Sequence, residues 1–200
     1  MRQFSPKALA TRAKILEAAN DLFYAHGYNA TGLDRIIAQA GVVKGNFYHH
    51  FRSKEELAEA VVTWHRDRVF EKIETRRLLE EPSALAAFVA LLECMVSRSV
   101  CDGTEQLRGC LFGNFALELS AGSEIVREAL ESVFEEFRSV FRALLEKGIA
   151  QGEIREGLDL EETAKVTLSL MQGAILVDKT SQSQDQSASA IAFIEAYIRA

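Results

Sequence analysis

Hydrophobic residues recur every three or four positions along most of this chain, which is the period of one face of an α-helix. The clearest of these stripes comprises Val126, Leu130, Val133, Phe137, Val140 and Leu144. Stretches of alternating polar and apolar residues, typical of strands, do not occur, and the chain has only two prolines. The pattern therefore predicts an all-α fold.

Glycine, proline and capping residues divide this pattern into about nine helices. Pro6 begins the first helix, which Gly27 ends, and residues 1–6 form an arm. Ser53 and Glu56 form a capping box at the start of a long helix that we expect to reach Glu80. The remaining helices are predicted at 84–100, 110–119, 123–148, 160–177 and 191–198, with a loop at 101–109 and a polar linker at 181–187.

The stretch 31–51 contains two short apolar-periodic segments separated by a sharp break. Thr31 and Asp34 provide an N-terminal capping signal for the first, and Gly41 follows its last turn. The second runs from Lys44 to His50. Two short helices joined by a glycine-containing turn are typical of the helix-turn-helix, whose second helix enters the major groove of DNA.

The residue order within this stretch is more specific than its periodicity. The run AGVVKGNFYHHFRSKEEL resembles the DNA-binding signature of the TetR family of bacterial repressors, AGVSKGTLYHHFxSKEEL, and the resemblance extends from about Thr11 to Leu57. It implies an N-terminal three-helix DNA-binding domain followed by a helical ligand-binding and dimerisation domain. We place the boundary between 1–54 and 55–200.

If Phe47 and Phe51 point inward, the turn of about 100° per residue places Gly45, Asn46 and His49 on the opposite side of the helix. The amide of Asn46 can pair with adenine, and the other groups suit phosphate or assisting contacts. These positions also match those that bind operator in the family. The predicted DNA contacts are Thr31, Lys44, Gly45, Asn46, Tyr48, His49 and Lys54.

One position departs from the family signature. Val43 stands where the family usually has Ser or Thr, so the second helix of the motif should lack its side-chain N-cap. Loss of such a cap costs about 1 kcal/mol.

The charge of the chain is unevenly distributed. Its net charge is −6, with eight Lys or Arg and three Asp or Glu within residues 1–54, and fifteen and twenty-six in the remainder. DNA phosphates require local positive charge, and an acidic region elsewhere is compatible with that. The asymmetry favours two functional regions.

The last two predicted helices have apolar residues on two faces, whereas a surface helix of a monomer needs one. We interpret them as a homodimer interface, a four-helix bundle about a two-fold axis, as the family resemblance also implies. Burial inside one protomer is the alternative. The predicted interface residues are Val166, Leu170, Gly173, Ala174, Val177, Ile191, Ile194 and Ile198.

The C-terminal region is rich in aromatic residues and contains no histidine-based metal or catalytic site, phosphate loop or serine nucleophile elbow. We therefore predict no enzymatic activity, cofactor or metal. The resemblance implies a cavity for a small hydrophobic or aromatic effector. Its candidate lining is Trp64, Phe88, Met95, Cys110, Phe115, Phe137 and Met171.

Cys110 leaves a second mode of control open. The run Arg108-Gly109-Cys110-Leu111 resembles a segment of a TetR subgroup that responds to electrophiles through that cysteine. A position near a helix N-terminus and a neighbouring arginine both favour the thiolate. The alternative is a buried, inert cysteine.

The three cysteines do not indicate a disulfide framework, and no signal peptide or membrane span is predicted. We expect a cytoplasmic, homodimeric transcriptional repressor that binds a palindromic operator and is released by an effector. An effector-independent DNA binder is the alternative.

Overall fold

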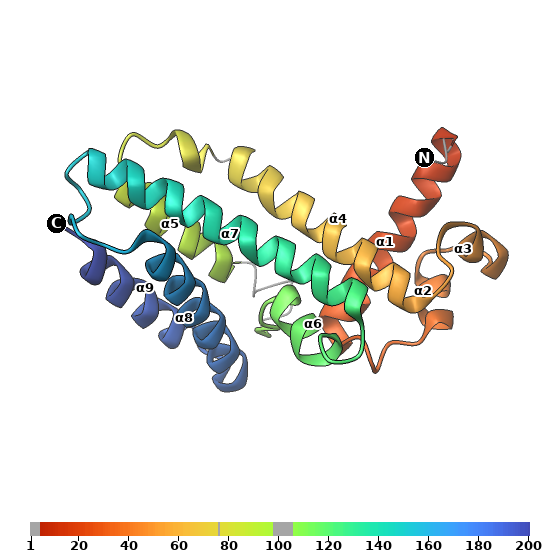
Figure 1. Cartoon of the computed structure of the whole chain (residues 1–200). Coiled ribbons are helices and arrows are strands. Elements are labelled where there is room, and N and C mark those ends of the chain that lie inside the picture. The colour runs from red at the N-terminus through yellow and green to blue at the C-terminus, as the bar shows by residue number, and fades with distance from the viewer. Residues whose placement is uncertain (1–4, 76, 98–105) are drawn as a thin grey trace. The chain divides into compact units, whose positions relative to one another are not determined.

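The computed structural model describes residues 5–75, 77–97 and 106–200. Within these ranges the chain forms nine α-helices and one short 3-10 helix, and no strand (Figure 1). The helices are α1 (Pro6–His26), α2 (Leu33–Gln39), α3 (Lys44–His50), α4 (Lys54–Thr75), η1 (Leu78–Glu80), α5 (Ala84–Ser97), α6 (Leu111–Leu119), α7 (Glu124–Ala150), α8 (Leu160–Ser181) and α9 (Asp185–Ile198). The predicted all-α fold is confirmed.

The chain divides into two compact units by its internal contacts. The first unit comprises residues 1–68 and 114–130, and the second comprises residues 69–113 and 131–200. Helices α4, α6 and α7 each contribute residues to both units. The functional division predicted from the sequence, 1–54 and 55–200, remains a prediction.

In the first unit, α1 forms the support on which the next two helices lie. The hydroxyl of Ser5 accepts a hydrogen bond from the amide of Ala8, and Pro6 begins the helix. Its buried apolar residues lie in its second half and are Ile15, Leu16, Ala18, Ala19, Leu22 and Phe23. At the other end Gly27 adopts φ 83°, a conformation that favours glycine, and its amide bonds to the carbonyl of Phe23.

The capping box predicted at the start of α4 is present in a modified form. The amide of Glu56 donates to the hydroxyl of Ser53 at 3.0 Å, as expected. The Glu56 carboxylate accepts from the amide of Arg52 rather than from that of Ser53. Helix α4 ends at Thr75, and η1 covers the last residues of the predicted long helix.

The second unit has an aromatic core. Phe88 of α5 lies against Phe141 of α7, with ring centroids 5.4 Å apart, and Phe137 contacts both Phe70 and Phe112 at 5.3 and 6.4 Å. Edge-on and tilted ring contacts of this kind add to the stabilisation that burial supplies. The core therefore joins residues of α4, α5, α6 and α7.

Helices α8 and α9 lie side by side and run in opposite directions (Figure 1). The predicted linker at 181–187 is wrong in length, because α9 already begins at Asp185. The carboxylate of Asp178, which is 2% exposed, accepts the amides of Gln186 and Ser187 at 2.9 and 3.0 Å. A side chain of α8 thus caps the first turn of α9, a long-range interaction that local pattern does not indicate.

Some predicted segments lie partly outside the described residues. These are the N-terminal arm at 1–4, the end of the helix predicted at 84–100, and residues 101–105 of the predicted loop, which include Cys101.

Candidate DNA-binding site

The recognition helix of the predicted motif, α3, is held by two phenylalanines. Phe47 and Phe51 are buried, and their ring centroids lie 5.8 Å apart. The guanidinium of Arg12, on α1, lies 5.1 Å from the centre of the Phe51 ring. This apolar attachment fixes which face of α3 points away from the protein.

The outward face carries the predicted contact residues of α3. Lys44, Gly45, Asn46, Tyr48 and His49 are all exposed. A methyl group added at Gly45 would have no atom within 4 Å, so packing within the protein does not require glycine there. These five residues thus form one solvent-exposed surface. It carries an ammonium group, an amide, a phenol and an imidazole, and one position without a side chain.

The N-terminal end of α3 lacks a side-chain cap, as the sequence predicts. Val43 occupies the N-cap position with extended backbone, and its side chain is 67% exposed. Its carbonyl accepts the amides of Asn46 and Phe47 at 2.9 and 3.2 Å. The Lys44 ammonium lies 3.5 Å from the Asp34 carboxylate of α2.

The prediction that Thr31 caps α2 and offers its hydroxyl to a phosphate is wrong. Thr31 is fully buried, and Gly32 is the N-cap residue, without a side-chain cap bond. The Thr31 hydroxyl lies 2.7 Å from the carbonyl of Gly27 and 3.3 Å from that of Leu22, to which it donates. Its role is to join the loop 27–32 to the end of α1.

Lys54, predicted to contact phosphate, is half-buried at the start of α4. Its ammonium donates to the carbonyl of Tyr28 at 2.5 Å and lies 4.0 Å from the centre of the Tyr28 ring. Burial lowers the pKa of Lys54, and the nearby carboxylate of Glu118 opposes that shift. If Lys54 contacts a phosphate, its ammonium must therefore bond to the phosphate and to the Tyr28 carbonyl at the same time.

Glu118, on α6, is a residue of this site that the sequence did not indicate. Its carboxylate oxygens accept the amides of Tyr28 and Asn29 at 3.0 and 2.8 Å. The glutamate lies about ninety positions from this loop along the chain, and its own surroundings carry no capping signal. Only the tertiary structure brings the two together.

His50, the last residue of α3, is half-buried. Burial lowers the pKa of this imidazole, and the neighbouring His49 and Arg12 lower it further. The centroids of the two histidine rings lie 5.1 Å apart. Folding therefore shifts the protonation equilibrium of His50 toward the uncharged imidazole, relative to the unfolded chain.

The residues predicted to line an effector cavity fall into two groups. Trp64 and Phe115 belong to the first unit, where Phe115 contacts the rings of Phe23 and Tyr28. The other five belong to the second unit: Phe88, Phe137 and Met171 are buried, and Met95 and Cys110 are half-buried. The set is not brought together within either unit.

Cys110 directly precedes α6, which begins one residue later than predicted, so its position near a helix N-terminus is confirmed. The side-chain amide of Gln172, on α8, donates to its sulfur at 3.6 Å. Of the described cysteines, Cys94 is buried and Cys110 is half-buried, and both are free thiols. The thiol of Cys110 is thus the more accessible of these two.

The residues predicted for an interface on α8 and α9 fall into a buried set, for which the prediction is wrong, and an exposed set, for which it remains a prediction. Ala174, Ile194 and Ile198 are buried within the protomer, and Ile191 is half-buried. Their side chains belong to the core, because α9 packs this face against the rest of its own chain. The exposed or half-exposed members are Val166, Leu170, Gly173 and Val177.

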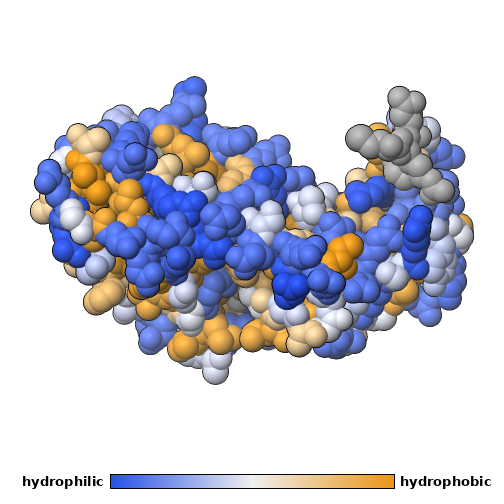
Figure 2. Space-filling view, viewed as in Figure 1, coloured by the Kyte–Doolittle hydropathy of each residue, from blue (hydrophilic) through white to orange (hydrophobic). Residues whose placement is uncertain are grey.

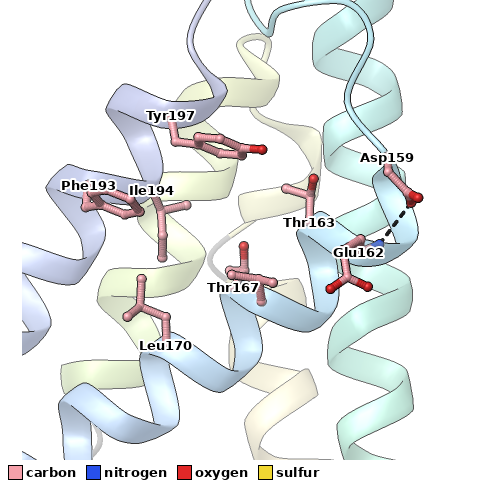
Figure 3. A pocket seen from close by; sticks show the side chains of 9 residues that line it. Asp159, Glu162, Thr163, Thr167, Leu170, Phe193, Ile194 and Tyr197 are labelled. Carbon is pink, nitrogen blue, oxygen red and sulfur yellow. Dashed lines mark hydrogen bonds between the residues drawn. The ribbon is translucent and has the colours of Figure 1, made fainter.

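Two of these exposed members, Val166 and Leu170, line a groove between α8 and α9 with a volume of about 280 Å³ (Figure 3). Phe193 and Tyr197 of α9 lie on one side of this groove, Thr163, Thr167 and Leu170 of α8 lie on the other, and Asp159 and Glu162 lie at one end. Figure 2 shows apolar side chains among the polar surface where these two helices lie. Sequence periodicity did not single out Phe193 and Tyr197 as exposed.

Among the described residues, no group of three or more histidine, cysteine or acidic side chains is arranged to hold a metal ion. Within the same part of the chain, every helix is too short or too polar to cross a membrane.

The sequence matches two families of known proteins. Residues 15–61 match the family described as bacterial regulatory proteins, tetR family, and residues 82–194 match the tetracyclin repressor-like C-terminal domain. The chain is 33% identical over 177 residues to the HTH-type transcriptional regulator LmrA of Bacillus subtilis, covering 86% of this chain and 88% of LmrA. It is 31% identical over 180 residues to the HTH-type transcriptional repressor DhaR of Mycobacterium sp., covering 87% of this chain and 85% of DhaR.

The fold is similar to that of a solved relative. The crystal structure of E. coli NemR in its reduced form superposes with a TM-score of 0.84 at 27% identity, covering 94% of this chain and 96% of that one. The two matched families together cover most of the chain. The protein therefore belongs to the tetR family of bacterial regulatory proteins and is a helix-turn-helix transcriptional regulator.

Proposed function

We propose that this protein is a repressor that binds a palindromic DNA operator as a homodimer and is released by a small-molecule effector. The main observation that supports this proposal is the chemistry of the outward face of α3. This face exposes an amide, a phenol and an ammonium group on Asn46, Tyr48 and Lys44, while Phe47 holds the opposite face in the core. A helix so attached suits insertion into a major groove.

Each group on this face has a distinct proposed role. Asn46 reads an adenine edge, since its amide both donates and accepts. Lys44, Tyr48, His49 and Lys54 contact phosphates or assist the base contact, and Gly45 admits close approach of the backbone. DhaR, which is named as a repressor, is a relative over most of the chain and supports the sign of regulation.

Dimerisation is proposed through the exposed apolar residues of α8 and α9. Val166, Val177, Phe193 and Tyr197 are about half or more exposed in the protomer, and large exposed apolar side chains at adjacent helices are typical of an interface. To bind a palindromic operator, the two recognition helices of such a dimer must reach successive major grooves, about 34–36 Å apart.

The effector is proposed to be a small hydrophobic or aromatic molecule bound in the C-terminal region. Phe88, Phe137 and Met171 are buried apolar side chains of the second unit, and side chains of this kind predominate in the sites that bind such ligands. The effector must bind the DNA-incompetent form more tightly than the DNA-bound form, because only a difference in affinity shifts the population.

The test combines operator selection with a mass measurement. Purified full-length protein is incubated with a random double-stranded library, and bound sequences are amplified over several rounds. We expect an enriched inverted repeat, bound by a species of twice the protomer mass in light scattering. Recovery of unrelated sequences, or binding as a monomer, would contradict the proposal.

A second candidate mode of control is modification of Cys110 by an electrophile or oxidant. The half-buried thiol lies at the start of α6 and contacts the amide of Gln172, and NemR, a structural relative, has been solved in a reduced form. Mild N-ethylmaleimide treatment followed by mass spectrometry tests it. We expect labelling of Cys110 with loss of operator binding, which Cys110→Ser resists; an unlabelled Cys110 in the native dimer rejects this mode.

A further inference from the structure

The loop between α1 and α2 is held by charged side chains from two other helices. The Glu118 carboxylate accepts the amides of Tyr28 and Asn29, one on each oxygen, at 3.0 and 2.8 Å. On the other side the Lys54 ammonium donates to the Tyr28 carbonyl at 2.5 Å. One residue of the loop, Tyr28, is thus bound through both its amide and its carbonyl.

Gly27 makes room for this carboxylate. A methyl group at that position would lie 2.8 Å from Oε1 of Glu118, and φ at Gly27 is 83°. The backbone conformation therefore favours glycine, and any other residue there would displace the Glu118 carboxylate from its present position. The loop and the glutamate fit one another closely.

Aromatic contacts reinforce the same attachment. Phe115 lies one turn before Glu118 on α6, and its ring contacts those of Phe23 and Tyr28 at 5.5 and 6.4 Å. Residues three apart on a helix share a face, so α6 presents an apolar and a charged group together to the loop.

The loop leads directly into the helix-turn-helix. The Tyr28 carbonyl also accepts the amide of Thr31 at 3.1 Å, and Gly32 then caps α2. Helices α2 and α3 contact one another and α1. The loop conformation therefore sets where α2 begins and, through it, where α3 lies.

We propose that Glu118 is a positioning residue for operator binding, which fixes the 27–31 loop and thereby the placement of α2 and α3. The inference rests on the proposed DNA-binding function. Glu118 lies within 82–194, the range that matches the C-terminal domain family, yet by its contacts it belongs to the compact unit of the DNA-binding motif. A side chain outside the helix-turn-helix sequence thus completes that motif.

A neighbouring contact places the same segment against the start of α4. The hydroxyl of Ser123 donates to the carboxylate of Glu55. Residues 114–130 thus hold both the 27–31 loop and the first turn of α4, the two parts of the chain that flank α2 and α3 in sequence.

The charge of Glu118 matters as well as its shape. Its carboxylate lies near the half-buried ammonium of Lys54, whose ionised form it stabilises. Glu118→Gln keeps the size of the side chain but removes the charge and presents an amide donor toward one of the two backbone amides. We therefore expect this variant to release the loop without creating a cavity.

The experiment compares operator binding and amide exchange in the full-length protein. Glu118→Gln should bind the selected operator about tenfold more weakly, the loss expected for one charge-assisted hydrogen bond. Hydrogen exchange at Tyr28 and Asn29 should accelerate, with helix content unchanged by circular dichroism. Glu118→Asp, which retains the charge but is shorter, should lie between Glu118→Gln and the wild type.

The control is Glu128→Gln, which removes an equal charge from an exposed glutamate of α7 in the same unit. Equal loss of affinity in the control, or wild-type affinity in Glu118→Gln, would overturn the proposal.

A double variant, Lys54→Met with Glu118→Gln, tests whether the two side chains act through Tyr28. Its loss of operator-binding free energy should be smaller than the sum of the losses in the two single variants, because both side chains hold Tyr28. Additive losses would also overturn the proposal. A wild-type protein that selects no operator overturns the proposed function first.

Discussion

The ammonium of Lys44, at the start of α3, lies 3.5 Å from the carboxylate of Asp34 on α2. Both side chains are largely exposed, so this ion pair contributes little to stability. A DNA phosphate can therefore replace the carboxylate at small cost. The pair keeps Lys44 beside the outward face of the recognition helix in the absence of DNA.

Lys44→Ala should weaken binding to operator and to unrelated DNA by similar factors. A lysine that contacts phosphate carries no sequence information, and its loss should reduce the slope of log K against log salt by about one unit. Fluorescence anisotropy between low and moderate salt measures this slope. Lys72→Ala, which removes an exposed lysine from α4, should leave the slope unchanged; an equal reduction in both variants contradicts the assignment.

Asn46→Ala should change which sequences are bound, whereas Tyr48→Ala should weaken all of them. A bidentate amide–adenine contact discriminates between bases by about 1–3 kcal/mol, and a phenol on a phosphate does not discriminate. A panel of operators with single base changes separates the two effects. Asn46→Ala with the wild-type order of preference would exclude its base-reading role.

Val43→Ser should stabilise the protein by about 1 kcal/mol. Val43 occupies the N-cap position of α3 without a side-chain cap bond, and a serine hydroxyl there can accept from a first-turn amide. Val43→Ala is the matched control, because it removes the exposed methyl groups without adding a cap. Thermal unfolding of the wild type and the two variants measures their difference in stability. A serine variant no more stable than the alanine variant would show that the missing cap does not reduce the stability of the protein.

The position of α3 could be predicted from local sequence because its signals are local. Phe47 and Phe51 four residues apart, with Gly41 ahead of them, specify the helix and its buried face. The helix is found at Lys44–His50, as predicted.

Thr31 and Glu118 show where local reasoning stops. A threonine before a helix is usually a cap, but here the polar carbonyls at the end of α1 are closer and the hydroxyl turns to them. Glu118 contacts a loop about ninety residues away in the sequence, and the residues next to it give no signal that predicts this contact. Both outcomes depend on tertiary placement, which periodicity does not encode.

The same limit explains the interface residues. The two apolar faces predicted for α8 are present: Met171 and Ile175 are buried, and Val166 and Val177 are about half exposed. On α9 the sequence predicts that the isoleucines pack against a second protomer, but Ile194 and Ile198 are buried in the core of their own protomer. A hydrophobic stripe shows that a helix face is covered but does not show which chain covers it.

Acidification should destabilise the folded protein through His50. Its pKa is lowered in the folded state by burial, His49 and Arg12, so the unfolded chain binds this proton first as the pH falls. Stability from this group is fully present above the pKa of the unfolded histidine and declines below it. The urea midpoint measured from pH 7.5 to 5.5 should fall less steeply in His50→Gln than in the wild type; parallel curves would exclude His50 as the cause.

Val166→Glu and Phe193→Glu should each convert the dimer into a monomer. Both side chains are exposed in the protomer, by 52% and 64%, and both border the groove between α8 and α9. A buried, unpaired carboxylate at an interface costs more than the apolar contact it replaces. Light scattering should then give a mass near 22.2 kDa. Operator affinity should fall by at least about a hundredfold, because the two half-sites no longer bind as one unit.

Leu117→Glu is the matched control for these two variants. Leu117 is also a large apolar residue and is more exposed, at 74%, but it belongs to α6 and does not line the groove. This variant should remain a dimer, since an exposed leucine outside the interface makes no contact that a carboxylate would disrupt. If Leu117→Glu dissociates and the two groove variants do not, the dimer forms through α6, and the surface of α8 and α9 has another role.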